Sequence, residues 1–222
     1  MSKNIKTLCE AYSPYDHVQR LEAIFREFDR VLITSSFGTT SAILLHLLQK
    51  VKPGHPIYMI DTGYLFKETL AYKETLRRRL NLNIIEVKPK QNEHIFTKLD
   101  YTWAHHPDLC CHFNKVEPMG ELKKDFDVWI SGMLGNSNSF RTNAPLFKQD
   151  RDMLRFYPLI DMSAEEAQAH QIIYELPQHP LESKGYGSVG CTHCTAKGLG
   201  RSGRWAGKQK TECGLHIIPK NA

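Results

Sequence analysis

The sequence predicts a doubly wound α/β fold with a mostly parallel sheet, followed by a C-terminal tail rich in glycine and cysteine. First, short apolar runs alternate with amphipathic segments of helical length, the pattern of strands joined by crossover helices. Second, the length of 222 residues, with 41% hydrophobic and 24% charged residues, suits one α/β domain with a sizeable core. Third, the composition changes after Pro180, where glycines crowd together with lysines, arginines and three of the six cysteines.

Each predicted element rests on hydrophobic spacing. The apolar runs are expected to form strands at residues 31–34, 56–60, 83–87, 127–131 and 154–160. Amphipathic spacing predicts helices at residues 17–30, 41–50, 66–80 and 163–176. The last helix begins with a capping box formed by Ser163 and Glu166, and it ends before Pro177.

Charge and hydropathy exclude several classes of protein. The net charge of +5, from 29 basic and 24 acidic residues, suits an anionic ligand and equally fits ordinary solubility charge. The lysines are scattered, so we expect no nucleic-acid partner. No apolar run approaches the ~18 residues of a spanning helix, and no apolar segment follows the start as in a secretory signal. We therefore expect a cytoplasmic protein without a membrane partner, whose cysteines serve metal binding or thiol chemistry rather than a disulfide framework.

A small, hydroxyl-rich turn at residues 34–41 joins the first predicted strand to its helix. Backbone N–H groups, hydroxyl donors and the positive end of the helix dipole can bind a phosphate at such a turn. The Walker pattern is absent, and a Ser/Thr helix cap without any ligand explains the same residues. Asp61, at the end of the second strand, would face the same crevice or serve as a turn residue.

Four of the six cysteines form two close pairs, Cys110 with Cys111 and Cys191 with Cys194. Two such pairs can converge on one metal centre. Tetrahedral zinc usually takes pairs with two to four intervening residues, which adjacent cysteines fit poorly. Adjacent cysteines can ligate different irons of a [4Fe–4S] cluster, so iron–sulfur is favoured over zinc, and buried structural thiols are the least favoured reading.

Cys213 is the candidate nucleophile. It lies beside Gly214, with Lys210 and His216 nearby, and cationic neighbours favour the reactive thiolate. A free surface thiol near the chain end is the alternative. Cys9 stands outside any motif and is expected to be a bystander.

These motifs resemble those of the assimilatory sulfonucleotide reductases, which reduce adenylyl sulfate or its 3′-phosphorylated form to sulfite. The resemblance runs from about Val31 to His216. It rests on Ser35-Ser36-Phe37-Gly38, Ile60-Asp-Thr-Gly-Tyr-Leu-Phe66, Cys110-Cys111, Lys115-Val-Glu-Pro-Met119, Gly185-Tyr-Gly-Ser-Val-Gly-Cys-Thr-His-Cys-Thr195, Arg201-Ser-Gly-Arg-Trp205 and Lys210-Thr-Glu-Cys-Gly-Leu-His216.

The resemblance implies a fold related to the ATP-pyrophosphatase group, a [4Fe–4S] cluster on the two cysteine pairs, Cys213 as nucleophile, and thioredoxin or glutaredoxin as electron donor. Residues 1–180 would then be a nucleotide-binding α/β domain with an N-terminal helical arm, and residues 181–222 a mobile segment with cluster ligands and the catalytic cysteine. A homo-oligomer is left open. The substrate contacts are expected at Ser35, Ser36, Gly38, Thr39, Asp61, Lys115, Arg141, Arg201, Arg204 and His216.

Some features are mixed between the two branches of this family. The four paired cysteines resemble the branch that uses adenylyl sulfate, whereas Ser-Ser-Phe-Gly and Asn114 resemble the cluster-free branch that uses the 3′-phosphorylated nucleotide. Leu134 stands where the family commonly has arginine, which removes an expected cation. We expect adenylyl sulfate to be the substrate, with the 3′-phosphorylated form, or both, as the alternative.

Two other functions compete with this interpretation. An ATP-pyrophosphatase that adenylates or thiolates a substrate would favour a Ser-Gly-Gly-x-Asp-Ser type of loop, and this chain has Thr39-Thr40-Ser41 there. A non-enzymatic, cluster-bearing regulator would release no sulfite.

Overall fold

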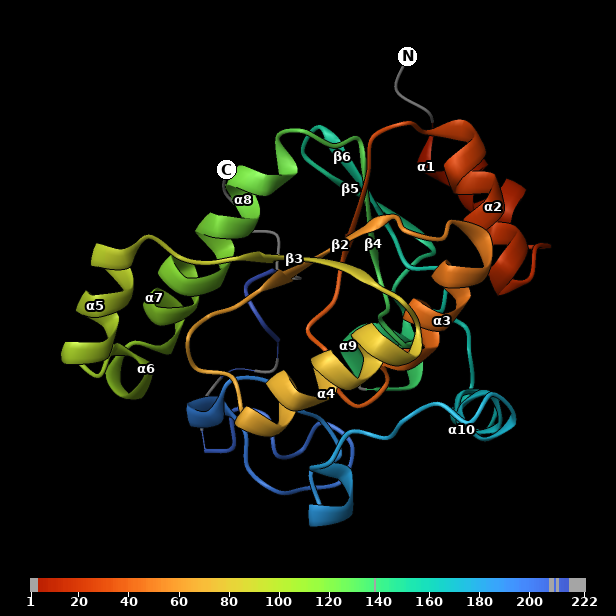
Figure 1. Ribbon diagram of the computed structural model, residues 1–222. Helices are drawn as coiled ribbons and strands as arrows, with labels where there is room; N and C mark the ends of the chain where they lie inside the picture. The colour runs from red at the N-terminus through yellow and green to blue at the C-terminus, as the bar shows by residue number, and fades with distance from the viewer. Residues whose placement is uncertain (1–3, 138, 208–209, 211, 216–222) are drawn as a thin grey trace.

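The computed structural model describes residues 4–137, 139–207, 210 and 212–215, which fold around one six-stranded sheet (Figure 1). The strand order is β3-β2-β1-β4-β6-β5, and each neighbouring pair is parallel except β5 with β6. The strands are β1 Val31–Thr34, β2 Pro56–Ile60, β3 Asn83–Val87, β4 Val128–Ser131, β5 Phe147–Asp150 and β6 Met153–Phe156. The predicted α/β class and mostly parallel sheet are therefore confirmed.

The helices cover both faces of this sheet and extend beyond its β3 edge (Figure 1). They are α1 Ile5–Tyr12, α2 His17–Glu27, α3 Ser41–Val51, α4 Lys67–Arg79, α5 Gln91–Leu99, α6 Thr102–His105, α7 Pro107–Cys111, α8 Glu117–Lys123, α9 Ser139–Thr142 and α10 Ala164–Ile173. In the described part of the chain, none of them has the length and apolar character needed to cross a bilayer.

The local signals placed most elements within a few residues of their observed bounds. The Ser163–Glu166 capping box is present, with both reciprocal hydrogen bonds. The strand predicted at 154–160 was wrong at its end: β6 stops at Phe156, and the next residues form turns around Pro158, which lacks an N–H for a sheet ladder. Helix α1, helices α5 to α9 and the antiparallel strand β5 were not predicted.

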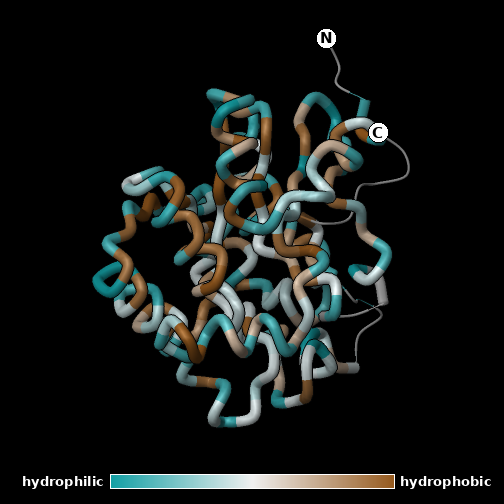
Figure 2. The backbone as a smooth tube through the Cα atoms, turned by 90° about the vertical axis from the view of Figure 1, so that its right-hand side faces the viewer, coloured by the Kyte–Doolittle hydropathy of each residue, from teal (hydrophilic) through white to brown (hydrophobic). Residues whose placement is uncertain are grey.

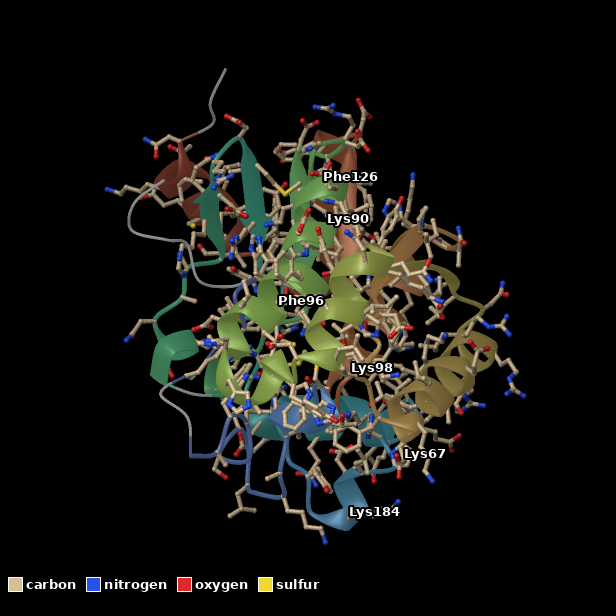
Figure 3. The ribbon with its side chains drawn as sticks, turned by 90° about the vertical axis from the view of Figure 1, so that its left-hand side faces the viewer. Lys67, Lys90, Phe96, Lys98, Phe126 and Lys184 are labelled. Carbon is tan, nitrogen blue, oxygen red and sulfur yellow. The ribbon has the colours of Figure 1, made fainter. Side chains whose placement is uncertain are left out.

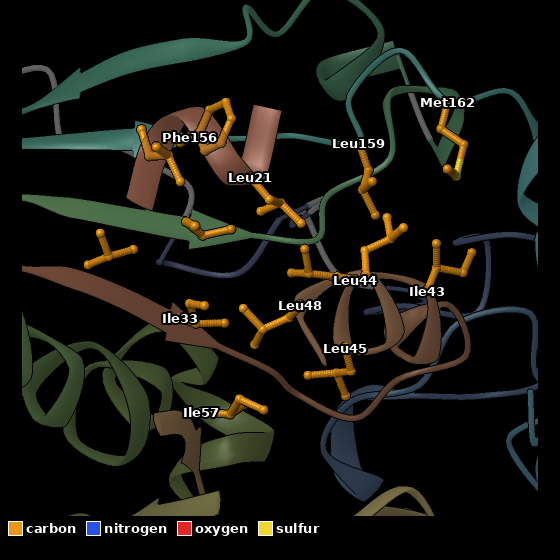
Figure 4. Close-up of a cluster of buried hydrophobic side chains, with 14 of the residues drawn as sticks. Leu21, Ile33, Ile43, Leu44, Leu45, Leu48, Ile57, Phe156, Leu159 and Met162 are labelled. Carbon is orange, nitrogen blue, oxygen red and sulfur yellow. The ribbon is translucent and has the colours of Figure 1, made fainter. Parts of the chain in front are cut away.

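The main core lies between the sheet and helices α2, α3 and α4. Leucines and isoleucines of α3 pack against β1, β2 and β6 (Figure 4). Side chains alternate along β1, because Val31 and Ile33 face this core while Leu32 joins Trp129 in a second cluster on the opposite face, beside α8. Hydrophobic stretches accordingly concentrate inside the molecule (Figure 2). Figure 3 shows the outer side of α5, where Phe96 and Lys98 are exposed.

The topology creates a switch point between β1 and β4. From β1 the chain moves outward to β2 and β3, and it then returns to β4 on the other side of β1 before continuing to β6. The loops that leave β1 and β4 therefore diverge at the carboxyl edge of the sheet, where open α/β sheets leave a crevice for ligands.

Candidate active site

A cavity of about 610 Å³ opens at this switch point. It begins at Thr34 and Ser131, the last residues of β1 and β4, and the glycine-rich segment after Pro180 closes its other side. Nine of the predicted site residues line it: Ser35, Ser36, Gly38, Thr39, Lys115, Arg141, Arg201, Arg204 and Cys213. Residues that lie more than 170 positions apart in the chain thus meet in one place. The predicted contact His216 lies outside the described residues.

The loop after β1 directs the first turn of α3 toward the cavity. Phe37 has a positive φ of 49° and buries its ring completely, while the Ser35 hydroxyl accepts a hydrogen bond from the Phe37 N–H at 3.1 Å. Thr40, the N-cap residue, makes no side-chain capping bond. The positive end of the α3 dipole is therefore directed at the cavity without a side-chain cap, which suits an anion. The Thr39 hydroxyl donates to the Gly187 carbonyl at 3.3 Å, and this bond connects the loop to the glycine-rich segment after Pro180.

Asp61 does not line the cavity. Its Oδ1 accepts a hydrogen bond from the Gly63 N–H at 3.0 Å, and Gly63 has a φ of +72°. Asp61 thus forms the turn that follows β2, as the simpler reading of the sequence had it.

A buried carboxylate, Glu212, joins two of the predicted arginines. Arg141 donates from Nε to Oε1 at 2.8 Å and from Nη2 to Oε2 at 3.1 Å, and Arg201 donates from Nη2 to Oε2 at 3.1 Å. Glu212 is only 1% exposed. The sequence analysis did not single it out, although it lies within the motif that contains Cys213.

Arg201 and Arg204 surround Trp205 and retain hydrogen-bond donors for a ligand. Arg204 lies 4.5 Å from the centre of the Trp205 ring and donates from Nη1 to the Val189 carbonyl at 3.0 Å. Burial, together with the positive charge of Arg141, lowers the pKa of Arg201 to about 10, and burial likewise lowers that of Arg204. Within the described part of the chain, the Nε atoms of both arginines and Nε1 of Trp205 are buried without a partner. Such donors are costly unless something accepts from them, so they suit an anionic ligand.

Cys213 lies beside Lys115, a residue of the π-helical turn His112–Val116 between α7 and α8. The pKa of Lys115 is raised above its usual range, and the electrostatic influence of Cys213 is the largest cause. Cys213 is 8% exposed. The residues after it are also packed: Leu215 contacts the cluster around Trp129, and a Cβ on Gly214 would lie 2.9 Å from Val116 Cγ2. The thiol is therefore held inside the cavity next to a cation.

The two cysteine pairs converge beside the cavity. Burial raises the pKa of Cys110 to about 12, and the charges of Cys111, Cys191 and Cys194 contribute to this increase. Burial also raises the pKa of Cys111 to about 11, an effect that the Lys115 charge opposes. These mutual effects place the four sulfurs in one electrostatic neighbourhood. No group of three or more His, Cys, Asp or Glu side chains among the described residues is arranged to hold a metal ion.

Polar neighbours orient the sulfurs. The Asn114 side-chain amide donates to Cys110 Sγ at 3.7 Å and to the Cys110 carbonyl at 2.9 Å. Thr62 Oγ1 lies 3.3 Å from Cys191 Sγ. Two of the four sulfurs, those of Cys110 and Cys191, thus have hydrogen-bonding neighbours, and four thiols are the type of donor that a four-thiolate iron–sulfur cluster needs, although the side chains of the described residues are not arranged around a metal ion.

Leu134 is a core residue that reaches the cavity. It is 4% exposed and belongs to the main core cluster. An apolar side chain therefore forms this part of the wall, and the cations of the cavity come from the lysine and arginines described above.

A family model for the phosphoadenosine phosphosulfate reductase domain matches residues 30–197. The chain belongs to this family. It is 36% identical over 208 residues to a protein of Bacillus cytotoxicus named adenosine 5′-phosphosulfate reductase, with 88% of each chain covered. A protein of the same name from Halalkalibacterium halodurans is 31% identical over 223 residues, with 96% of each chain covered.

Solved structures support the fold. A phosphoadenylyl-sulfate reductase from Candida auris, crystallised as a phosphate complex, superposes with a TM-score of 0.75 at 22% identity, covering 88% of this chain and 98% of that one. Yeast FAD synthetase in complex with FAD superposes with a TM-score of 0.58 at 13% identity, covering 89% and 70%. An FMN adenylyltransferase from Candida glabrata superposes with a TM-score of 0.56 at 15% identity, covering 88% of this chain and 68% of that one, so the α/β architecture is shared with an adenylyltransferase.

Gly190 offers a test of the arginine cluster. A Cβ at this position would lie 2.5 Å from Arg204 Cζ, so Gly190→Ala should displace the guanidinium. Inorganic sulfate should raise the Tm of the wild-type protein, and Gly190→Ala should need about tenfold more sulfate for the same shift, because one charge-assisted contact is worth ~1.5–3 kcal/mol. Gly120→Ala is the matched control, since a Cβ there meets no atom within 4 Å. An equal response of Gly190→Ala and Gly120→Ala to sulfate would show that Arg204 is not part of an anion site.

Proposed function

We propose that this protein reduces adenylyl sulfate to sulfite and AMP in assimilatory sulfate reduction, with thioredoxin or glutaredoxin as the electron donor. The observation that carries the proposal is the burial of Cys213 next to Lys115 in a cavity that three arginines also line. The names of the relatives at 31–36% identity agree with it. A thiolate inside a cationic cavity can attack a sulfur atom that anionic oxygens surround.

The substrate carries two anionic groups that the cavity can neutralise. The backbone N–H groups of Ser36, Gly38 and Thr39, together with the positive end of the α3 dipole, suit the phosphate, as at other helix N-termini. Arg201, Arg204 and Lys115 suit the sulfate, since they lie near Cys213. This arrangement brings the sulfur to the thiolate and lowers the charge repulsion between two negative reactants.

The first half-reaction is a displacement at sulfur. The Cys213 thiolate attacks the sulfate sulfur, an S–S bond forms, and the bond from sulfur to the bridging phosphate oxygen breaks. AMP leaves with the electron pair of that bond, and Cys213 carries an S-sulfonate. Lys115 and the arginines stabilise the charge that shifts to the departing phosphate.

The second half-reaction transfers two electrons from a protein dithiol. One thiolate of reduced thioredoxin or glutaredoxin attacks the Cys213 sulfur, so that sulfite leaves and a mixed disulfide forms. The second thiol of the donor then attacks the donor's first cysteine sulfur in the mixed disulfide. This step releases the Cys213 thiolate and leaves the donor as an intramolecular disulfide. Cys213 must therefore react first inside the cavity and then with a protein outside it. We propose that residues 181–222 form the mobile segment that permits this exchange.

Cys110, Cys111, Cys191 and Cys194 would hold a [4Fe–4S] cluster, and such a cluster would link the tail to the domain. His193 adds to this link, because it stacks on Trp103 of α6 with ring centres 3.9 Å apart. The catalytic steps above involve Cys213 and the donor thiols only.

Adenylyl sulfate remains the favoured substrate over its 3′-phosphorylated form. Asn114, one of the two features that resemble the other branch, contacts Cys110 and His94 and is not among the residues that line the cavity. It therefore has no direct part in selecting the nucleotide.

Substitution of the nucleophile tests the reaction. Cys213→Ser should lower sulfite release by roughly a thousandfold or more, because a hydroxyl is a poor nucleophile at neutral pH. Nucleotide binding, measured by calorimetry, and iron content should remain close to those of the wild type. Sulfite release by Cys213→Ser at the wild-type rate would contradict the proposal.

The nucleotide preference is tested by kcat/KM. We expect a higher value for adenylyl sulfate, because a 3′-phosphate adds charge that must be paired or it is desolvated at a cost. A preference of more than about tenfold for the 3′-phosphorylated form would reverse this assignment.

The cluster is tested by metal content. Anaerobically purified protein should be brown and contain about four iron atoms per chain. Cys110→Ser should lose most of the iron, whereas Cys9→Ser should keep it, because Cys9 lies near Phe147 on the far strand β5. Zinc in place of iron, or a Cys110→Ser variant that retains its iron, would exclude the cluster.

A further inference from the structure

We propose that Glu212 is a positioning residue that docks the catalytic segment, residues 212–215, into the cavity through its ion pairs with Arg141 and Arg201. This inference rests on the proposed function for the role of Cys213, and it adds a device that holds Cys213 in the first half-reaction and releases it for the second.

The geometry of Glu212 joins three parts of the chain. Its two carboxylate oxygens accept three hydrogen bonds, two from Arg141 in α9 and one from Arg201 in the glycine-rich segment. The side chains of the two arginines are only 12% and 13% exposed. Hydrogen bonds between such buried ions are short and strong, and the two bonds from Arg141 also fix the orientation of the carboxylate.

The charge of Glu212 matters as much as its shape. The positive charge of Arg141 lowers the pKa of Arg201, and the charge of Glu212 opposes this effect. If the carboxylate leaves the cavity, two buried guanidinium groups remain close together without it. Removing one partner from a buried ionic group is strongly unfavourable. Docking of Glu212 and neutralisation of the two arginines are therefore one event.

Cys213 lies between this ionic anchor and an apolar one. On its other side, Gly214 approaches Val116 and Leu215 packs on the cluster that contains Trp129. Cys213 can leave the cavity only if the segment gives up one or both anchors. The ionic anchor borders the substrate site, because Arg141 and Arg201 also line the cavity that receives the anionic substrate.

Replacement of Glu212 by glutamine removes the negative charge and leaves the size of the side chain nearly unchanged. Glu212→Gln keeps the length of the side chain and can still accept a hydrogen bond, but it no longer compensates the two arginines. We expect the segment to dock less often in this variant. Glu182→Gln is the matched control, since Glu182 is another carboxylate that lines the cavity and it bonds to the His179 N–H instead.

The first measurement is amide hydrogen exchange of the peptide that contains residues 212–215, in the purified protein without substrate. Glu212→Gln should accelerate exchange of this peptide by about tenfold or more, since a charge-assisted pair is worth ~1.5–3 kcal/mol. Glu182→Gln should leave it at the wild-type rate. Wild-type exchange in Glu212→Gln would overturn the proposal. This readout requires no turnover, so it stands apart from the proposed function.

The second measurement separates the two half-reactions. In single turnover without donor, Glu212→Gln should release AMP more slowly than the wild type, because Cys213 is docked less often. Reduction of preformed Cys213 S-sulfonate by thioredoxin should be as fast or faster. A variant in which both half-reactions slow equally would reduce Glu212 to a general structural role and contradict the proposal.

Arg141→Lys supplies a second route if Glu212→Gln folds poorly. It keeps the positive charge and loses the two-pronged contact with Glu212. Amide exchange of the peptide that contains residues 212–215 should therefore be faster in Arg141→Lys than in the wild type, by less than the roughly tenfold increase expected for loss of the carboxylate charge. Unchanged exchange in Arg141→Lys would also count against the docking role.

Discussion

The concentration of positive charge in one partly buried cavity is the constraint on which the rest of this structure depends. Lys115, Arg141, Arg201 and Arg204 come from three separate regions of the chain, and the cavity they line is closed to much of the solvent. Bringing them together costs free energy unless negative charge is supplied. Glu212 supplies one such charge, and a thiolate at Cys213 supplies another. An anionic substrate is the third source, and it explains why buried donors on Arg201, Arg204 and Trp205 lack partners within the described part of the chain.

The parallel sheet forms the crevice in which these cations gather, and the segment after Pro180 contributes Cys213. The switch between β1 and β4 opens a crevice whatever the sequence of the tail, and the superposition on an adenylyltransferase shows the same architecture in another context. The segment after Pro180 forms the other wall of the cavity. Its Cys191 loop pairs with Leu65 and Thr192 donates to Tyr64, so the segment is tied to the loop after β2. Cys213, the proposed nucleophile, follows about 20 residues later.

Much of the fold was readable from the sequence because its signals are local. Apolar runs, the Ser163–Glu166 capping box and the hydroxyl-rich loop each depend on neighbouring residues. Strand β5 escaped prediction because Phe147–Asp150 alternates poorly and gains its place only by pairing with β6. Helix α1 is short, and its Tyr12 packs on Phe147 with the ring centres 4.9 Å apart. These two residues are 135 positions apart in the sequence, so local patterns cannot predict the contact.

The same distinction applies to the site. Residues in recognisable motifs could be assigned to one cavity, and the structure brings nine of them there, among them one lysine, three arginines and one cysteine. The role of Glu212 could not be read from the sequence, because it depends on Arg141, 71 positions away. Asp61 illustrates a local alternative that the sequence left open: its motif suggested a ligand contact or a turn residue, and its carboxylate accepts a hydrogen bond from the backbone two residues on.

The most direct test of the central claim is to mix the purified protein with adenylyl sulfate in the absence of any electron donor and to follow both products. The account predicts one AMP released per chain and one sulfonate attached to the peptide that contains Cys213, with thioredoxin then releasing that sulfonate as sulfite. A sulfonate on any other cysteine, or no AMP release by a protein that binds the nucleotide, would contradict it.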